Sequence, residues 1–172
     1  PCTVQAGERG VRIMADMLVK LFALQPDPAL AQRLQAEGVR IRRALPPDRD
    51  RVIAFVRENF PEFAAETACA FSHLPVHCYI ATEGKTLVGF ACYEVTAPDF
   101  FGPTAVLAGH RRRGIGRALL LASLLALKEL GYAYAVIGWP ARDAVAFYRN
   151  AVGALPIPDD SLGLYRDMIE QG

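Results

Sequence analysis

The residues best suited to chemistry form one short segment, Arg111–Gly116, with the sequence RRRGIG. A strand-like run precedes this segment and a long apolar run follows it, so its two glycines lie where a turn opens a helix. The first backbone N–H groups of a helix have no partner within the helix, and the helix dipole adds partial positive charge there. Glycines let an anion approach the backbone, and arginines add forked donors. The segment therefore predicts an anion or phosphate site.

The spacing of these residues alone leaves two interpretations open. The glycine pattern is not the G-x-G-x-x-G of dinucleotide-binding proteins, and the lysine and hydroxyl residue of a P-loop are missing. Glycines for close helix packing and arginines in solvent would explain the same residues without any ligand.

The composition favours one ordinary globular domain. The chain has 172 residues, of which 52% are hydrophobic, and its formal net charge is +1. This near-neutral charge disfavours nucleic acid as a partner. The apolar run Ala118–Leu127 is too short to span a membrane, and Asp16 and Lys20 interrupt any signal-like stretch, so we expect a cytoplasmic protein. We expect the natural start at Met14 or Met17, with residues 1–13 as an addition.

The cysteines and histidines do not form a recognisable metal site. His73, His77 and Cys78 fit no common zinc spacing, so no metal is expected. The cysteines form no C-x-x-C pair and are expected as reduced thiols: Cys2, Cys69, Cys78 and Cys92.

The elements around the glycine segment predict a mixed α/β sheet. Residues 1–38 are expected as an N-terminal extension that contains a helix over 28–37, and residues 39–172 as a single domain. The strands expected from alternation and turn signals are 39–42, 77–81, 87–93, 104–107, 134–138 and 162–168. Helices are expected after Pro46, after Pro61, and over 114–130 and 143–151. The hairpin at Glu83–Lys85 requires antiparallel strands, and the crossover through the long helix requires a parallel pair.

With these elements in place, the segment resembles the acetyl-coenzyme A signature of the GNAT superfamily of N-acetyltransferases. The matching pattern is Arg111-x-x-Gly114-x-Gly116 between a strand and a long helix. Val106 precedes it at the family's usual spacing, and the segment Ala146–Asn150 is similar to the family's F-Y-x-K motif. The resemblance covers about Val39 to Ile169. It implies a GNAT-like fold, with a mostly antiparallel central sheet flanked by helices on both faces.

The resemblance also implies a cosubstrate site and an acid. Backbone groups of Val106 and Leu107 would bind the pantetheine arm of acetyl-CoA, and Arg111 would mainly brace the turn. Tyr148 would lie near the cofactor sulfur and protonate the leaving thiolate. The pyrophosphate would be held by the backbone N–H groups of Arg112, Arg113, Gly114, Ile115, Gly116 and Arg117.

The general base and the acceptor are less well defined. Glu94, at the end of a strand, is the preferred base; the alternatives are Glu66, His73, His77 and Asp99. Aromatic residues offer an apolar lining for an acceptor: Phe60, Phe63, Phe71, Phe100, Phe101 and Trp139.

Three functions fit this resemblance. The preferred one is transfer of the acetyl group of acetyl-CoA to a primary amine of a small molecule. The others are acetylation of a protein or peptide, and a non-catalytic acyl-CoA-binding regulatory module. The resemblance further implies a homodimer as a common assembly.

Overall fold

The computed structural model describes residues 15–158, 163–165 and 169. The strands are β1 (Met17–Lys20), β2 (Val39–Arg43), β3 (Cys78–Glu83), β4 (Thr86–Tyr93), β5 (Phe100–Val106), β6 (Tyr134–Ile137) and β7 (Leu155–Pro156). The helices are α1 (Pro28–Ala36), α2 (Arg49–Asn59), α3 (Ala64–Ala70), α4 (Ile115–Glu129) and α5 (Val145–Val152). Short 3-10 turns include η1 (Leu21–Ala23) and η5 (Gly163–Tyr165).

The strands form one mixed sheet in the order β2-β3-β4-β5-β6-β1-β7. Neighbours are antiparallel except β5 and β6, which are parallel and joined through α4. The β3–β4 hairpin turns at Gly84, whose φ of 58° suits glycine. These observations confirm the predicted mixed, mostly antiparallel sheet.

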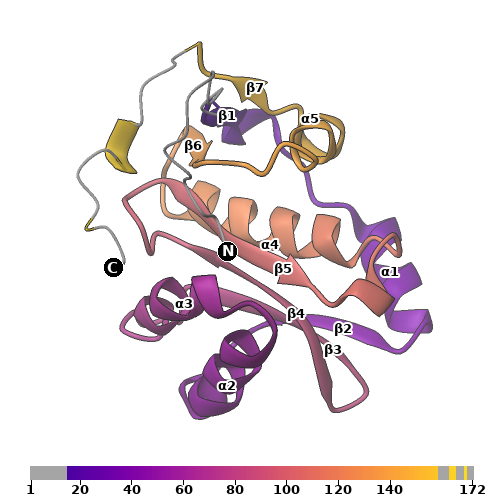
Figure 1. Cartoon of the computed structure of the whole chain (residues 1–172). Helices are drawn as coiled ribbons and strands as arrows, with labels where there is room; N and C mark the ends of the chain where they lie inside the picture. Colours follow the sequence, from indigo (N-terminus) through magenta and orange to yellow (C-terminus); the bar gives the residue numbers. More distant parts are fainter. Residues whose placement is uncertain (1–14, 159–162, 166–168, 170–172) are drawn as a thin grey trace.

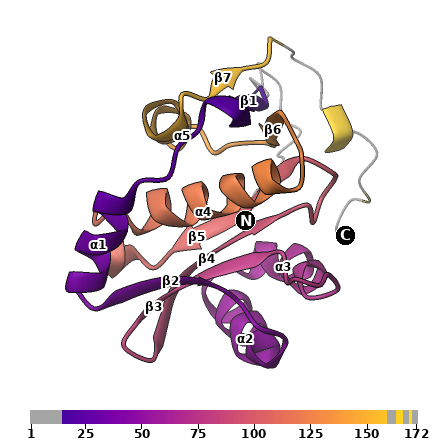
Figure 2. The same ribbon diagram turned by 180° about the vertical axis from the view of Figure 1, so that it is seen from behind.

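Helices cover both faces of the sheet, as predicted. In Figures 1 and 2, α2 and α3 lie on one face of β2–β5, and α4 lies on the other, between these strands and the β6–β1–β7 part. This enclosure explains why α4 is apolar around most of its circumference, with Leu119, Leu120, Leu124 and Leu127 fully buried. β4 is buried on both faces, and this central strand therefore separates the two cores.

The segment before Val39 contributes to the same layers. β1 lies between β6 and β7 and pairs antiparallel with both. Met17 and Val19 are fully buried, and Leu30 and Leu34 of α1 belong to the α4-side core. The domain boundary near residue 38 stays a prediction, but the sheet is built with this early strand.

The expected last strand over 162–168 is wrong where the structure describes it. Residues Gly163–Tyr165 form the 3-10 turn η5, and residues 162 and 166–168 lie outside the described part. β1 already occupies the free edge of β6. The described C-terminal turn therefore packs over the end of β6 instead of pairing with it, with the Tyr165 hydroxyl against Gly138.

Candidate functional site

The parallel strands β5 and β6 separate soon after they meet. They pair only at Phe100 with Val136 and at Phe101 with Ile137, although β5 continues to Val106. Near Gly102, β5 advances by three residues while its partner strand β4 advances by two, and this mismatch is a β-bulge. The edge of β5 beyond Phe101 therefore faces a gap between the two strands, and it carries backbone groups that no described strand pairs.

The direction of each backbone group along this edge follows from the pairing of Leu107. The Leu107 N–H donates to the Val88 carbonyl at 2.9 Å, and the Leu107 carbonyl accepts from the His110 N–H at 2.9 Å. Both backbone groups of Leu107 are thus engaged within the protein. Because alternate residues of a strand face opposite edges, the N–H of Val106 points into the gap. Of the two residues expected to hold the pantetheine arm, only Val106 has an N–H that faces the gap.

The turn between β5 and α4 presents a row of donors. Gly114, the residue before α4, has φ +90°, and Arg112 has φ +64°. No side chain caps the helix, and within the described residues the backbone N–H groups from Arg112 to Arg117 make no hydrogen bond. Left-handed residues next to a helix start turn successive N–H groups toward one point. This arrangement suits the oxygens of a phosphate group.

Two of the arginine side chains in the turn are held by carboxylates. Arg113 donates to Glu83 at 2.9 Å, and Arg117 lies 3.1 Å from Asp27, the residue that caps α1. These ion pairs neutralise side-chain charge that would otherwise reach an anion. The backbone N–H groups therefore remain the principal donors of the site.

Helix α1 fixes the turn from the other side. The Arg33 guanidinium donates to the Arg113 carbonyl at 3.0 Å. A Cβ at Gly114 would come within 2.7 Å of the Arg33 guanidinium and 2.9 Å of the Leu30 side chain. Gly114 is thus required by both its φ angle and its neighbours.

Tyr148 lies on α5, against the closed end of the gap. Its ring packs edge-on against Phe101, with centroids 6.2 Å apart, and only 7% of the residue is exposed. Burial raises the pKa of Tyr148 to about 12, so the phenol stays protonated at neutral pH. The neighbouring Phe147 lies over Gly116 and is half-exposed. Among the described residues the Tyr148 hydroxyl has no hydrogen-bond partner, so it remains free to donate.

Glu94 lies at the end of β4 in a left-handed conformation, with φ 52°. One carboxylate oxygen accepts from the Tyr132 hydroxyl at 2.5 Å. The other lies 3.3 Å from Nδ1 of His77, without the alignment of a hydrogen bond. Its carboxylate also contributes, after burial, to raising the pKa of Asp99.

His77 belongs to a stack of rings beside Glu94. Its ring lies parallel to His73, with centroids 4.1 Å apart, and to Tyr93 at 4.5 Å. Burial is the main cause that lowers the pKa of His77, followed by the His73 charge. Arg43 donates to the Tyr93 hydroxyl. The structure thus brings together four of the five candidate bases.

The fifth candidate base, Glu66, is separate from this cluster. It lies on α3 and accepts from the Thr96 hydroxyl at 2.6 Å. Sequence reasoning did not identify Tyr132 and Arg43 as members of the Glu94 cluster. Tyr132 is 38 residues from its partner Glu94, and no local spacing signals such a contact.

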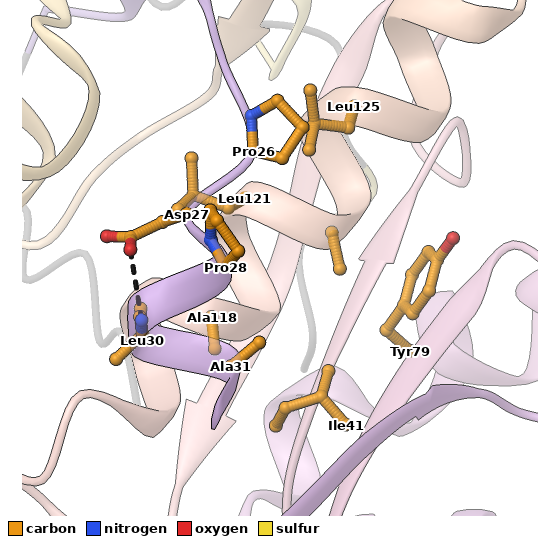
Figure 3. A pocket seen from close by; sticks show the side chains of 11 residues that line it. Pro26, Asp27, Pro28, Leu30, Ala31, Ile41, Tyr79, Ala118, Leu121 and Leu125 are labelled. Atoms are coloured by element: carbon orange, nitrogen blue, oxygen red, sulfur yellow. Dashed lines mark hydrogen bonds between the residues drawn. The ribbon is translucent and has the colours of Figure 1, made fainter. Parts of the chain in front are cut away.

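A separate cavity of about 280 Å³ lies between α1 and α4, above β2 and β3 (Figure 3). The Asp27 carboxylate at its rim accepts from the Leu30 N–H at 3.0 Å. The lining is mostly apolar: Pro26, Asp27, Pro28, Leu30, Ala31, Ile41, Tyr79, Ala118, Leu121, Ala122 and Leu125. Because it lacks the donors that a phosphate needs, we do not assign the anion site to this cavity.

The described residues contain no group of three or more histidine, cysteine or acidic side chains arranged to hold a metal ion. None of the described helices has the length and apolar character needed to cross a bilayer.

One family model, described as Acetyltransferase (GNAT) domain, matches residues 75–151 of this chain. These residues include the β3–β4 hairpin, the gap, the turn before α4 and nearly all of α5. A search of the curated proteins found no significant match.

Solved structures share the fold at low sequence identity. A GCN5-related glucosamine N-acetyltransferase region of a fungal multi-domain GH3 beta-N-acetylglucosaminidase matches with a TM-score of 0.69 and 15% identity, over 84% of this chain and 20% of that one. A GCN5-related N-acetyltransferase from Sphaerobacter thermophilus matches with a TM-score of 0.62 and 24% identity, over 89% and 51%. One from Kribbella flavida matches with a TM-score of 0.54 and 16% identity, over 85% and 55%. This chain thus spans about a fifth of the fungal protein and about half of each bacterial one.

Proposed function

This chain belongs to the GNAT superfamily of acetyltransferases, and we propose that it transfers the acetyl group of acetyl-CoA to a primary amine of a small-molecule acceptor. The observation that carries the proposal is the row of N–H groups at the start of α4. They have no partner among the described residues and lie beside the open edge of β5. A phosphate site joined to an open strand edge suits a ligand with a pyrophosphate and an amide-containing arm.

The residues present fit acetyl-CoA. The pyrophosphate would be bound by the N–H groups from Arg112 to Arg117, and the arm by the Val106 N–H. Arg111 acts on the turn itself, because its Nε donates to the Val106 carbonyl at 3.1 Å. The thioester supplies the activated acetyl group. The side chains at the closed end of the gap then position the acceptor and move protons.

Tyr148 is the proposed acid. Its position against Phe101 places the phenol at the closed end of the gap, and a pKa of about 12 keeps the proton on the oxygen until negative charge develops nearby. A protonated phenol that lacks another acceptor in the described structure can donate a hydrogen bond to the sulfur, and its proton follows as negative charge builds on the leaving thiolate.

Glu94 is the proposed base that removes a proton from the acceptor ammonium. The Glu94 backbone lies beside Phe100, since the Glu94 N–H donates to the Phe100 carbonyl at 2.8 Å. The Tyr132 hydroxyl holds one oxygen, which leaves the oxygen near His77 to take the proton. The Tyr132 hydroxyl therefore sets the orientation of the carboxylate.

The other two functions predict different behaviour. A protein or peptide acetyltransferase would act on lysine-containing peptides and not on small amines. A regulatory module would bind CoA and catalyse nothing. We further propose a cytoplasmic protein, with a homodimer as its expected assembly, that needs no metal and does not act on nucleic acid.

The test is release of free thiol from acetyl-CoA in the presence of primary amines and of lysine-containing peptides. We expect turnover with small amines, and we expect Tyr148→Phe to lower kcat by about 100-fold without changing CoA binding, as loss of a general acid does. Phenylalanine conserves the packing against Phe101. Turnover with peptides alone would favour the second function, and CoA binding without turnover would favour the third. Unchanged kcat in the variant would show that Tyr148 is not the acid.

A further inference from the structure

The face of the sheet opposite α4 carries an aromatic group at the closed end of the gap. Phe101 points toward α4, so its neighbour Phe100 points toward the α3 face. A Cβ at Gly138, which follows β6, would come within 3.1 Å of the Phe100 ring and would collide with the Tyr165 hydroxyl. Phe100 and Tyr165 therefore meet over the end of β6, directly across the sheet from the Phe101–Tyr148 contact.

Trp139 completes this group and is held in an unusual conformation. Its ring packs on Tyr165 with centroids 4.4 Å apart, and its backbone is left-handed, with φ +41°. Such a conformation is costly for a bulky residue and persists only where its surroundings enforce it. The Asp16 carboxylate does so, because one of its oxygens accepts from the Trp139 N–H at 2.9 Å. Asp16 directly precedes β1, so the early strand delivers this carboxylate to the end of β6.

Two carboxylates accompany this aromatic group. Asp16 is held at Trp139 by the hydrogen bond above, and Glu66 accepts from the hydroxyl of Thr96 at 2.6 Å, in the loop that leads into Phe100. Burial raises the pKa of Tyr165 to about 12, and the charges of Glu66 and Asp16 add to this increase. Among the described residues neither carboxylate forms an ion pair. We call these residues the acceptor rim: Asp16, Glu66, Phe100, Trp139 and Tyr165.

The residues of the acceptor rim are all partly exposed, so a ligand can reach them. Aromatic faces and carboxylates both attract ammonium groups. The nitrogen that attacks a thioester must be uncharged. A negatively charged rim stabilises a protonated nitrogen, so it does not favour the nitrogen that reacts. It favours a second nitrogen that keeps its proton.

We propose that the acceptor rim binds a second ammonium group of the acceptor, so that the substrate is a diamine or polyamine. This inference rests on the proposed function for the position of the reacting amine. Asp16 is a positioning residue for Trp139 as well as a source of charge, whereas Glu66 acts through its charge alone.

The chain offers a direct probe of this site, because Trp139 is its only tryptophan. Emission from Trp139 reports binding at the acceptor rim whether or not turnover occurs. Two probes differ only in the second ammonium group: 1,4-diaminobutane and butylamine. We expect both amines to change the emission of Trp139, and we expect the half-saturation concentration of the diamine to be about tenfold lower than that of butylamine. A tenfold ratio is what one cation near an aromatic face and a carboxylate contributes.

Three variants separate charge from position. Glu66→Gln conserves shape, and we expect it to reduce the preference for the diamine by at least about threefold. Asp16→Asn keeps an oxygen that can accept from the Trp139 N–H, so it also tests charge with little change in the backbone. Glu62→Gln removes an equivalent charge from an exposed residue that precedes α3, and we expect it to keep the full preference. Circular dichroism checks that each variant folds.

The possible outcomes distinguish this inference from the proposed function. Equal half-saturation concentrations for the two amines, no change in Trp139 emission with either amine, or an unchanged preference in both Glu66→Gln and Asp16→Asn would overturn the inference. Any of these results alongside normal CoA binding would leave the proposed function intact. Loss of CoA binding with a retained diamine preference would instead contradict the proposed function.

Discussion

Nε of Arg111 donates a hydrogen bond to the carbonyl oxygen of Val106 at 3.1 Å, and this contact closes the turn between β5 and α4. It joins the residue whose N–H faces the gap to the first residue of the glycine segment. The strand edge and the row of donors before α4 are therefore parts of one structure.

Removing this contact is expected to weaken CoA binding. In Arg111→Ala the turn loses its brace, and the N–H groups from Arg112 to Arg117 lose their common orientation. We expect the Kd for CoA to rise by about tenfold, which corresponds to the roughly 1.5 kcal/mol of one hydrogen bond to a charged group. Isothermal titration calorimetry measures the change. The control is Arg57→Ala, which removes the same charge from an exposed position on α2. Equal effects of the two substitutions would show that only net charge matters.

Gly114 is expected to tolerate no side chain. Gly114→Ala places a Cβ 2.7 Å from the Arg33 guanidinium and requires φ +90° of an alanine. We expect the free energy of unfolding to fall by about 1–3 kcal/mol. Urea denaturation measures it. The matched variant is Gly109→Ala, where a Cβ would have no neighbour within 4 Å, and it should change the value by less than about 0.5 kcal/mol. A Gly114→Ala protein as stable as the Gly109→Ala protein would contradict the described packing.

The role of Glu94 as a base predicts a specific change in pH dependence. Glu94→Gln retains an oxygen for the Tyr132 hydroxyl but cannot take a proton. We expect kcat to fall by about 100-fold or more and the acidic limb of the kcat profile to disappear, with CoA affinity unchanged. Glu58→Gln, on the exposed surface of α2, should leave both unchanged. If the acidic limb persists in Glu94→Gln, Glu94 has a structural role and the base lies elsewhere.

His77 is expected to make the fold sensitive to mild acid. Burial, then the His73 charge, lowers its pKa in the folded protein below the ordinary 6.5, so the unfolded chain binds the proton more tightly. Stability is therefore fully present above about pH 6.5 and is lost as the pH falls through the folded pKa. Thermal unfolding from about pH 7.5 down to about pH 5.5 measures this loss. His77→Gln should make the unfolding temperature depend less on pH. An equal pH dependence in the variant and the original protein would exclude His77 as the cause of this loss of stability.

The elements that the sequence predicted well are those with strong local signals. β2 alternates apolar and charged residues, and the β3–β4 hairpin turns at a glycine. α4 is a long apolar run that begins after Gly114 and ends before Gly131, whose φ is 100°. β1 was not predicted, because four residues carry little periodic signal and their partners lie on β6 and β7, more than a hundred residues later. β1 fills the edge of β6, and the described part of the expected last strand, Gly163–Tyr165, forms a 3-10 turn.

The candidate site shows the same division between local and distant information. The donor row before α4 follows from two glycines and a helix start, which are local features. The hydrogen bond from the Leu107 N–H to the Val88 carbonyl depends on strand register, which a single sequence does not specify. The Asp16–Trp139 contact joins residues at opposite ends of the chain and is visible only once the sheet is formed.

Calorimetric titration of the protein with CoA tests the central claim most directly. Acetyl-CoA and ATP are titrated under the same conditions, because ATP has phosphates but lacks the pantetheine arm. The backbone donors from Arg112 to Arg117, next to the open edge of β5, predict saturable binding of one CoA or acetyl-CoA per chain and much weaker binding of ATP. No measurable binding of CoA, or equal affinity for CoA and ATP, would contradict this assignment of the site.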